Sequence, residues 1–166
     1  DQLLGEIEKF LGTEARTEGL ENESALLATA LEDARAIVSH MLRDLESTHA
    51  TDGSGDVRNI YKVGLNSTRL LMALGDLICS WLLLRQARVA LERLKGQVSP
   101  KDKLFYEGKV AAARFFAQHT LPKLAAERVI AQSIGLGLMD LDEAAFCPLR
   151  RRRAQPCGPR RSDTPY

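Results

Sequence analysis

Aromatic residues are scarce in this chain: Phe, Trp and Tyr together make up 5% of its 166 residues, and there is a single tryptophan. Sheets draw on aromatic and β-branched side chains, which pack well on a pleated surface. Leu and Ala dominate here instead, and these side chains lose little conformational freedom in a helix. There is also no apolar–polar alternation of useful length and no internal repeat, so the sequence predicts an all-α protein.

Paired cysteines and long apolar runs are also missing. The three cysteines (Cys79, Cys147 and Cys157) show no CxxC spacing, and no secretory signal precedes them. This pattern indicates a reducing compartment, which we expect to be the cytoplasm. The longest apolar run, 70–84, contains Asp76 and falls short of the roughly 20 residues that a membrane span needs. We therefore predict a core helix there and no transmembrane segment.

Recognisable catalytic and metal-binding motifs are absent as well. The histidines His40, His49 and His119 are too widely spaced for a metal site, and the sequence has no HExxH, EF-hand or GxSxG motif. A GxG pair, Gly135 and Gly137, lacks a third glycine and follows a helical pattern, so it is better explained as a helix stop than as a phosphate loop. We predict no catalytic, cofactor-binding or metal-ligating residue.

Apolar spacing predicts an up-and-down bundle of about four helices. Ser99 followed by Pro100 is a typical helix start, and Pro122 should kink or split the last long helix. The run 70–84 is apolar on almost every side, which predicts a central position with partners all round. The predicted helical segments are 2–12, 23–49, 57–94 and 99–134. One last turn could follow at 140–146.

Small residues and apolar seams refine this prediction. Gly64 and Gly75 are candidate points for a bend or a close backbone approach. Another helix could approach closely at a surface of small side chains, which is formed by Gly108, Ala111 and Ala112. The seam expected on the second helix repeats every three or four positions; its members are Leu27, Leu31, Ala34, Val38, Met41 and Leu45.

Charge divides the chain at residue 146. The segment 147–166 holds six arginines against Asp163, a net charge of +5, which leaves −4 on the preceding residues. We predict a helical bundle over 1–146 and an Arg/Pro-rich disordered tail over 147–166. The run Arg150–Arg153 could bind nucleic acid, anionic lipid or nothing. It lacks interleaved aromatics and a folded scaffold, so we expect no nucleic-acid binding.

One stripe of the most apolar helix carries polar residues. Helical spacing puts Arg69 and Asp76 on the same side as Ala73 and Ser80. Buried charges need partners, so the stripe could form an internal polar network. Alternatively it is the solvated edge of that helix, because Asp and Arg are seldom fully buried.

Three spaced groups of residues form a recognisable series. The first group is Ile60–Asn66 followed by Thr68–Leu71, the second is Gly75–Leu77 with Trp81–Ala87, and the third is Phe105–Ala111 with Arg114–Phe116, closing at Leu121 and Pro122. This series resembles the C-terminal extension of the larger bacterial acyl-CoA dehydrogenases, and the resemblance covers about residues 1–146.

The resemblance implies a flavoenzyme parent. Such enzymes bind FAD, use a glutamate to take a proton from the α-carbon of an acyl-CoA, and pass electrons to an electron-transfer flavoprotein. It also implies that the catalytic glutamate lies upstream of Asp1. Separately, helix already begins at Gln2 with no Met or cap before it, so we expect the true N-terminus to be missing. We therefore expect a homo-oligomeric parent, with neither base nor FAD site on this chain. The alternative is a freestanding helical interaction module with a basic anchoring tail.

Glu107 could be mistaken for that catalytic base. Tyr106, Glu107 and Gly108 match the first three residues of the Tyr-Glu-Gly-Thr segment that the resemblance implies, but Lys109 stands where the family has Thr. This segment also lies in the third group of the resemblance rather than before it. We expect Glu107 to be an ordinary carboxylate on a helix surface.

Overall fold

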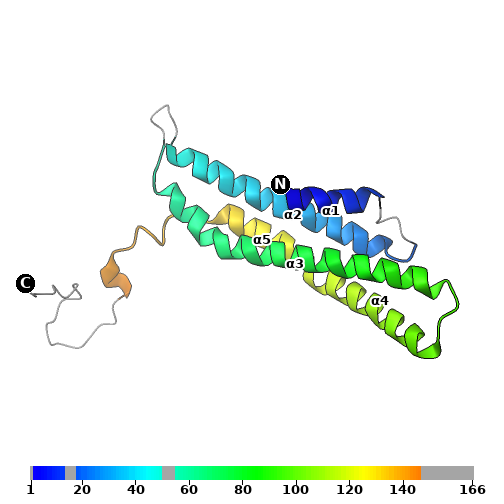
Figure 1. Cartoon of the computed structure of the whole chain (residues 1–166). Helices are drawn as coiled ribbons and strands as arrows, with labels where there is room; N and C mark the ends of the chain where they lie inside the picture. The colour runs from blue at the N-terminus through cyan, green and yellow to red at the C-terminus, as the bar shows by residue number, and fades with distance from the viewer. Residues whose placement is uncertain (1, 14–17, 50–54, 147–166) are drawn as a thin grey trace, which may run out of the picture. The chain divides into compact units, whose positions relative to one another are not determined.

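The computed structural model describes residues 2–13, 18–49 and 55–146 (Figure 1). Within these ranges every regular element is helical, which confirms the predicted all-α class. The elements are α1 (Gln2–Thr13), α2 (Glu21–Glu46), η1 (Ser47–His49), α3 (Asn59–Leu94), α4 (Pro100–Thr120), α5 (Lys123–Ser133) and η2 (Glu143–Phe146).

The described residues fall into two units, one that ends at Ile134 and one that begins at Gly135. The first unit holds α1 to α5. The second begins after α5 and includes η2, so one last turn forms where the sequence predicted it. The predicted tail, 147–166, lies outside the described residues, and its disorder stays a prediction.

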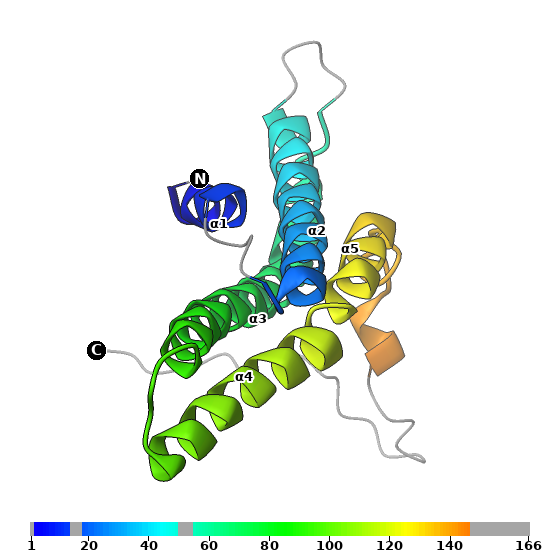
Figure 2. The same ribbon diagram turned by 90° about the vertical axis from the view of Figure 1, so that its right-hand side faces the viewer.

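The first unit is an up-and-down bundle. α3 runs antiparallel to α2 and then to α4 (Figure 1), and its most extensive contacts are with these two helices. Figure 2 shows α5 on one side of α2 and α1 on the other. The predicted bundle is therefore confirmed, with α4 and α5 together as its fourth member.

Both predicted helix signals at the ends of α4 act as expected. Ser99 caps α4 by accepting a hydrogen bond from the backbone N–H of Asp102 at 3.2 Å, with Pro100 in the first turn. Pro122 has no backbone N–H to donate, and it separates α4 from α5. The predicted interruption is a complete split.

α1 is attached to α2 through one apolar face and one ion pair. Leu4, Ile7 and Phe10 are buried, each one turn from the next. On the surface Arg35 donates a 2.6 Å hydrogen bond to Glu8. This bond and the positive charge of Arg35 lower the pKa of the Glu8 carboxyl. The ion pair thus joins the two helices beside their shared apolar contact.

The core is built largely from alanine and leucine. Small side chains on the buried faces let helix axes approach closely; these are Ala30, Ala34, Ala73, Ala87, Ala90, Ala113, Ala117 and Ala131. The predicted α2 seam is correct at four of its six members. Ile37 is fully buried instead of Val38, and Leu45 is exposed, because the buried face drifts around a straight helix relative to a seven-residue repeat.

α3 is covered on one side only. The prediction that 70–84 has partners all round is wrong, because Leu71 and Met72 are 69% and 63% exposed and Cys79 is also exposed. By length and composition α3 could cross a membrane, and 22% of its most apolar 18-residue stretch is buried. The buried part packs on α2, α4 and α5.

The small residues singled out from the sequence lie on uncovered surfaces. A Cβ atom added at Gly64, Gly75 or Gly108 would meet no atom within 4 Å. Ala111 and Ala112 are exposed. The predicted close approaches at these positions do not occur within the described residues, and α3 continues unbroken through both of its glycines.

The two sides of α3 predict different responses to one substitution. Leu77 is fully buried and Leu71 is 69% exposed. Leu77→Ala should lower the free energy of unfolding by about 2–5 kcal/mol, through lost burial and the cavity left behind. Leu71→Ala should change it by less than about 0.5 kcal/mol. Urea unfolding followed by circular dichroism measures both, and equal losses would contradict this description of α3.

Candidate functional site

Glu107 lies on the surface of α4, as expected. Its side chain is 51% exposed and pairs with Lys103, one turn earlier, at 3.9 Å. A general base acting on a carbon acid needs a carboxylate shielded from water beside the substrate. Glu107 is not shielded from water, and the hollow of about 240 Å³ that it lines between α3 and α4 is open, so its geometry is that of an ordinary surface carboxylate.

The histidines make local contacts. His40 lies 3.4 Å from Asp44 within α2, and His119 contacts the backbone oxygen of Phe115 at 2.8 Å while stacking on its ring. His49 is exposed at the end of η1. In the part of the chain that the structure describes, no three His, Cys, Asp or Glu residues are grouped so that they could hold a metal ion.

The polar stripe of α3 lies at the boundary between core and surface. Ala73 and Ser80 are buried, whereas Arg69 and Asp76 are half-buried at the rim. Arg69 donates to Glu127 on α5. The stripe is thus partly internal and partly solvated, and the positive charge of Arg69 is paired with a carboxylate of the neighbouring helix α5.

Sequence reasoning missed the other polar contacts that hold α5 in place. The fully buried Asn66 donates a 3.1 Å hydrogen bond to the backbone oxygen of Ala131. One turn earlier on α5, Arg128 donates at 2.6 Å to Asp33 on α2. The sequence gives one signal of the contact with Arg128: Asp33 lies four residues before the buried Ile37, so it places a carboxylate on an apolar face of the helix.

An open groove of about 470 Å³ lies between α3 and α4. We call it the α3–α4 groove. Its lining contains no carboxylate. α3 contributes Leu82, Arg85, Gln86, Arg88, Val89 and Ala90, and α4 contributes Phe105, Tyr106 and Lys109.

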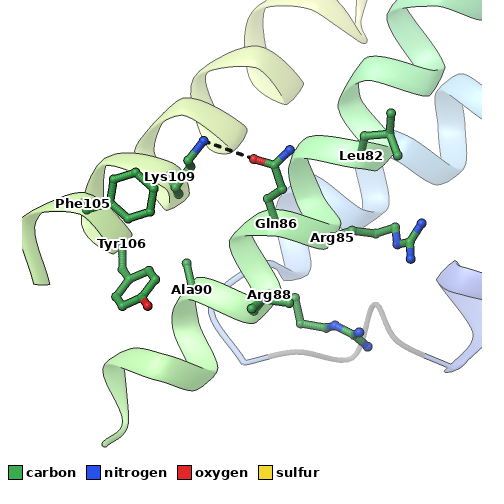
Figure 3. A pocket seen from close by; sticks show the side chains of 9 residues that line it. Leu82, Arg85, Gln86, Arg88, Ala90, Phe105, Tyr106 and Lys109 are labelled. Atoms are coloured by element: carbon green, nitrogen blue, oxygen red, sulfur yellow. Dashed lines mark hydrogen bonds between the residues drawn. The ribbon is translucent and has the colours of Figure 1, made fainter. Parts of the chain in front are cut away.

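Lys109 reaches across the α3–α4 groove. Its amine lies 3.3 Å from Oε1 of Gln86 on the facing helix and 5.4 Å from the centre of the Phe105 ring (Figure 3). Arg85 and Arg88 extend away from α4, and the Arg85 guanidinium lies 5.2 Å from the Trp81 ring centre. The one cation aimed across the groove is therefore an amine held between an amide and an aromatic ring.

A second feature is the uncovered side of α3. We call it the open face and define it by Leu71, Met72, Gly75 and Cys79, which follow one another at helical spacing and are all exposed. Large apolar side chains such as Leu71 and Met72, exposed side by side, are typical of surfaces that contact another protein segment. The open face is thus a candidate contact surface.

Comparison with known proteins identifies relatives. The sequence matches the family described as "Acetyl-CoA dehydrogenase C-terminal like" over residues 3–142. It is 42% identical, over 142 residues, to the broad-specificity linear acyl-CoA dehydrogenase FadE5 of Mycobacterium tuberculosis, covering 86% of this chain and 22% of that protein. It is 30% identical, over 125 residues, to a butyryl-CoA dehydrogenase of Syntrophomonas wolfei, covering 72% and 20%. The chain spans about one fifth of the length of these curated relatives.

Substitution of the buried Asn66 tests whether its hydrogen bond stabilises the attachment of α5 to α3. Its partner, the carbonyl of Ala131, lies in the last turn of α5, where carbonyls lack partners within the helix. Asn66→Ala should lower the free energy of unfolding by about 1–3 kcal/mol. Ser67→Ala, at the exposed neighbouring position, serves as the control. Indistinguishable urea midpoints for the two variants would show that the buried bond is not needed.

Proposed function

This chain belongs to the family of acyl-CoA dehydrogenase C-terminal domains, and from that premise we propose that it is a helical scaffold of a flavin-dependent acyl-CoA dehydrogenase. In this proposal the chain contributes packing surface, while the catalytic base and the flavin site belong to other segments of the enzyme. The reaction of the whole enzyme is α,β-dehydrogenation of an acyl-CoA thioester.

The observation that carries the proposal is the open face of α3. The small residues Gly75 and Cys79 lie between the larger Leu71 and Met72 on one side and Leu82 on the other, all of them exposed. Such a stripe suits a close-packed neighbour, because small side chains admit another backbone and large ones fill the space around it. The relatives are about five times as long as the matched segment and can supply that neighbour.

The described residues do not suit FAD. A flavin dinucleotide is held through its pyrophosphate by backbone N–H groups at a helix N-terminus or glycine-rich loop. The residues that line the α3–α4 groove lie inside α3 and α4, where backbone N–H groups bond within the helix. Gly135 and Gly137 follow the end of α5 rather than precede a helix of useful length. We therefore derive no redox step on this chain.

The proposed partners belong to the whole enzyme. They are an acyl-CoA substrate, an electron-transfer flavoprotein as electron acceptor and a second copy of the enzyme, with the cytoplasm as compartment. The open face and the exposed Phe115 of α4 are surfaces that contacts with the rest of the enzyme or with the second copy could use.

A chimera tests the scaffold directly. Residues 3–142 would replace the matching segment of the Mycobacterium tuberculosis relative. The chimera should purify with bound flavin, absorbing near about 450 nm, and oxidise acyl-CoA, whereas the isolated chain should do neither. Glu107→Gln in the chimera should leave kcat/KM within about twofold, because a surface carboxylate makes no contact with the transition state.

Two results would count against this function. Flavin bound to the isolated chain would place a cofactor site among its residues. A loss of kcat/KM of about a thousandfold in the Glu107→Gln chimera, with flavin retained, would make Glu107 a catalytic group.

A further inference from the structure

We propose that the α3–α4 groove is a binding site for a soluble organic anion: a carboxylate or phosphate joined to an apolar body. Apart from Leu82, which also borders the open face, this inference concerns residues that the scaffold role does not use. It stands on the groove itself and does not depend on the proposed enzyme.

The size and lining of the groove suit a small amphiphile. Its volume of about 470 Å³ lies within the range of small-molecule sites. Leu82 and Val89 on α3 and Phe105 on α4 give it apolar walls, and the buried Ala90 lies between them. Phe105 is 60% exposed, so a ligand that covered its ring would remove apolar surface from water.

The charge of the groove selects an anion. None of its lining residues is acidic, and Lys109 projects into the gap between the helices (Figure 3). The surrounding hairpin, residues 85–109, carries seven basic residues against three acidic ones, a net charge of +4. A locally positive surface attracts anions and raises their concentration near it.

The Lys109 amine is positioned for such a ligand. Gln86 accepts a hydrogen bond from it at 3.3 Å, and the Phe105 ring lies beneath it at 5.4 Å. An ammonium group has three donors, so this one can bind an anion while keeping its bond to Gln86. The anionic head would then lie at Lys109 and the apolar body along Val89 and Phe105.

Calorimetric titration of the whole chain tests the site with decanoate as the probe. Decanol carries the same alkyl body without charge, and inorganic phosphate carries charge without the body. We expect decanoate to bind at least about tenfold more tightly than either, because the site uses both parts of the ligand. Vesicles of phosphatidylglycerol and phosphatidylcholine should produce no comparable binding.

Two lysine variants locate the site. Lys109→Met keeps an apolar stem and removes the charge. It should weaken decanoate binding by about 10- to 100-fold, which corresponds to the free energy of one hydrogen bond to a charged group. Lys103→Met removes the same charge from the same helix outside the groove, and it should change the affinity by less than about twofold. Circular dichroism confirms that both variants keep their helices.

Several results would overturn the proposal. They are equal affinity for decanol and decanoate, no binding of decanoate, equal effects of the two lysine variants, and binding to vesicles without binding to free decanoate. The first would mean a purely apolar surface and the third an unspecific charge effect. The last would mean a membrane surface rather than a site for a soluble anion.

Discussion

The structure depends on how the apolar surface of α3 is divided. Apolar side chains lie on most sides of this 36-residue helix, but α2, α4 and α5 all pack against one side of it. That side is lined at helical spacing by a buried stripe, and burial of this stripe joins the other helices into one unit. Its members are Asn66, Ala73, Leu77, Ser80, Leu84, Ala87 and Ala90.

The proposed scaffold role rests on the uncovered side of α3. In that proposal the catalytic base and the flavin site lie on other segments of the enzyme, and this chain contributes surfaces for contact. The open face suits a close-packed protein neighbour, whereas the α3–α4 groove, with Lys109 reaching across it, suits a small charged molecule.

Local signals in the sequence were sufficient for the helices and their ends. Ser99 with Pro100 and the break at Pro122 act through atoms of neighbouring residues, so spacing alone predicts them. The coverage of 70–84 was mispredicted, because hydrophobicity does not show whether a covering surface lies on the same chain. The pairing of Arg69 with Glu127 and the groove at Lys109 also needed the fold, because each joins residues from different helices.

Thiol accessibility on the open face is the most direct test of the central claim. Cys79 lies on that face and is exposed in this chain. In the isolated chain it should react with iodoacetamide nearly as fast as a free thiol. In the chimera with the Mycobacterium tuberculosis relative, the alkylation rate of Cys79 under native conditions should be lower by about tenfold or more, because a covered thiol reacts only after local opening. Peptide mass spectrometry measures both rates. Equal rates in the two proteins would show that the open face is not covered and would contradict the scaffold account.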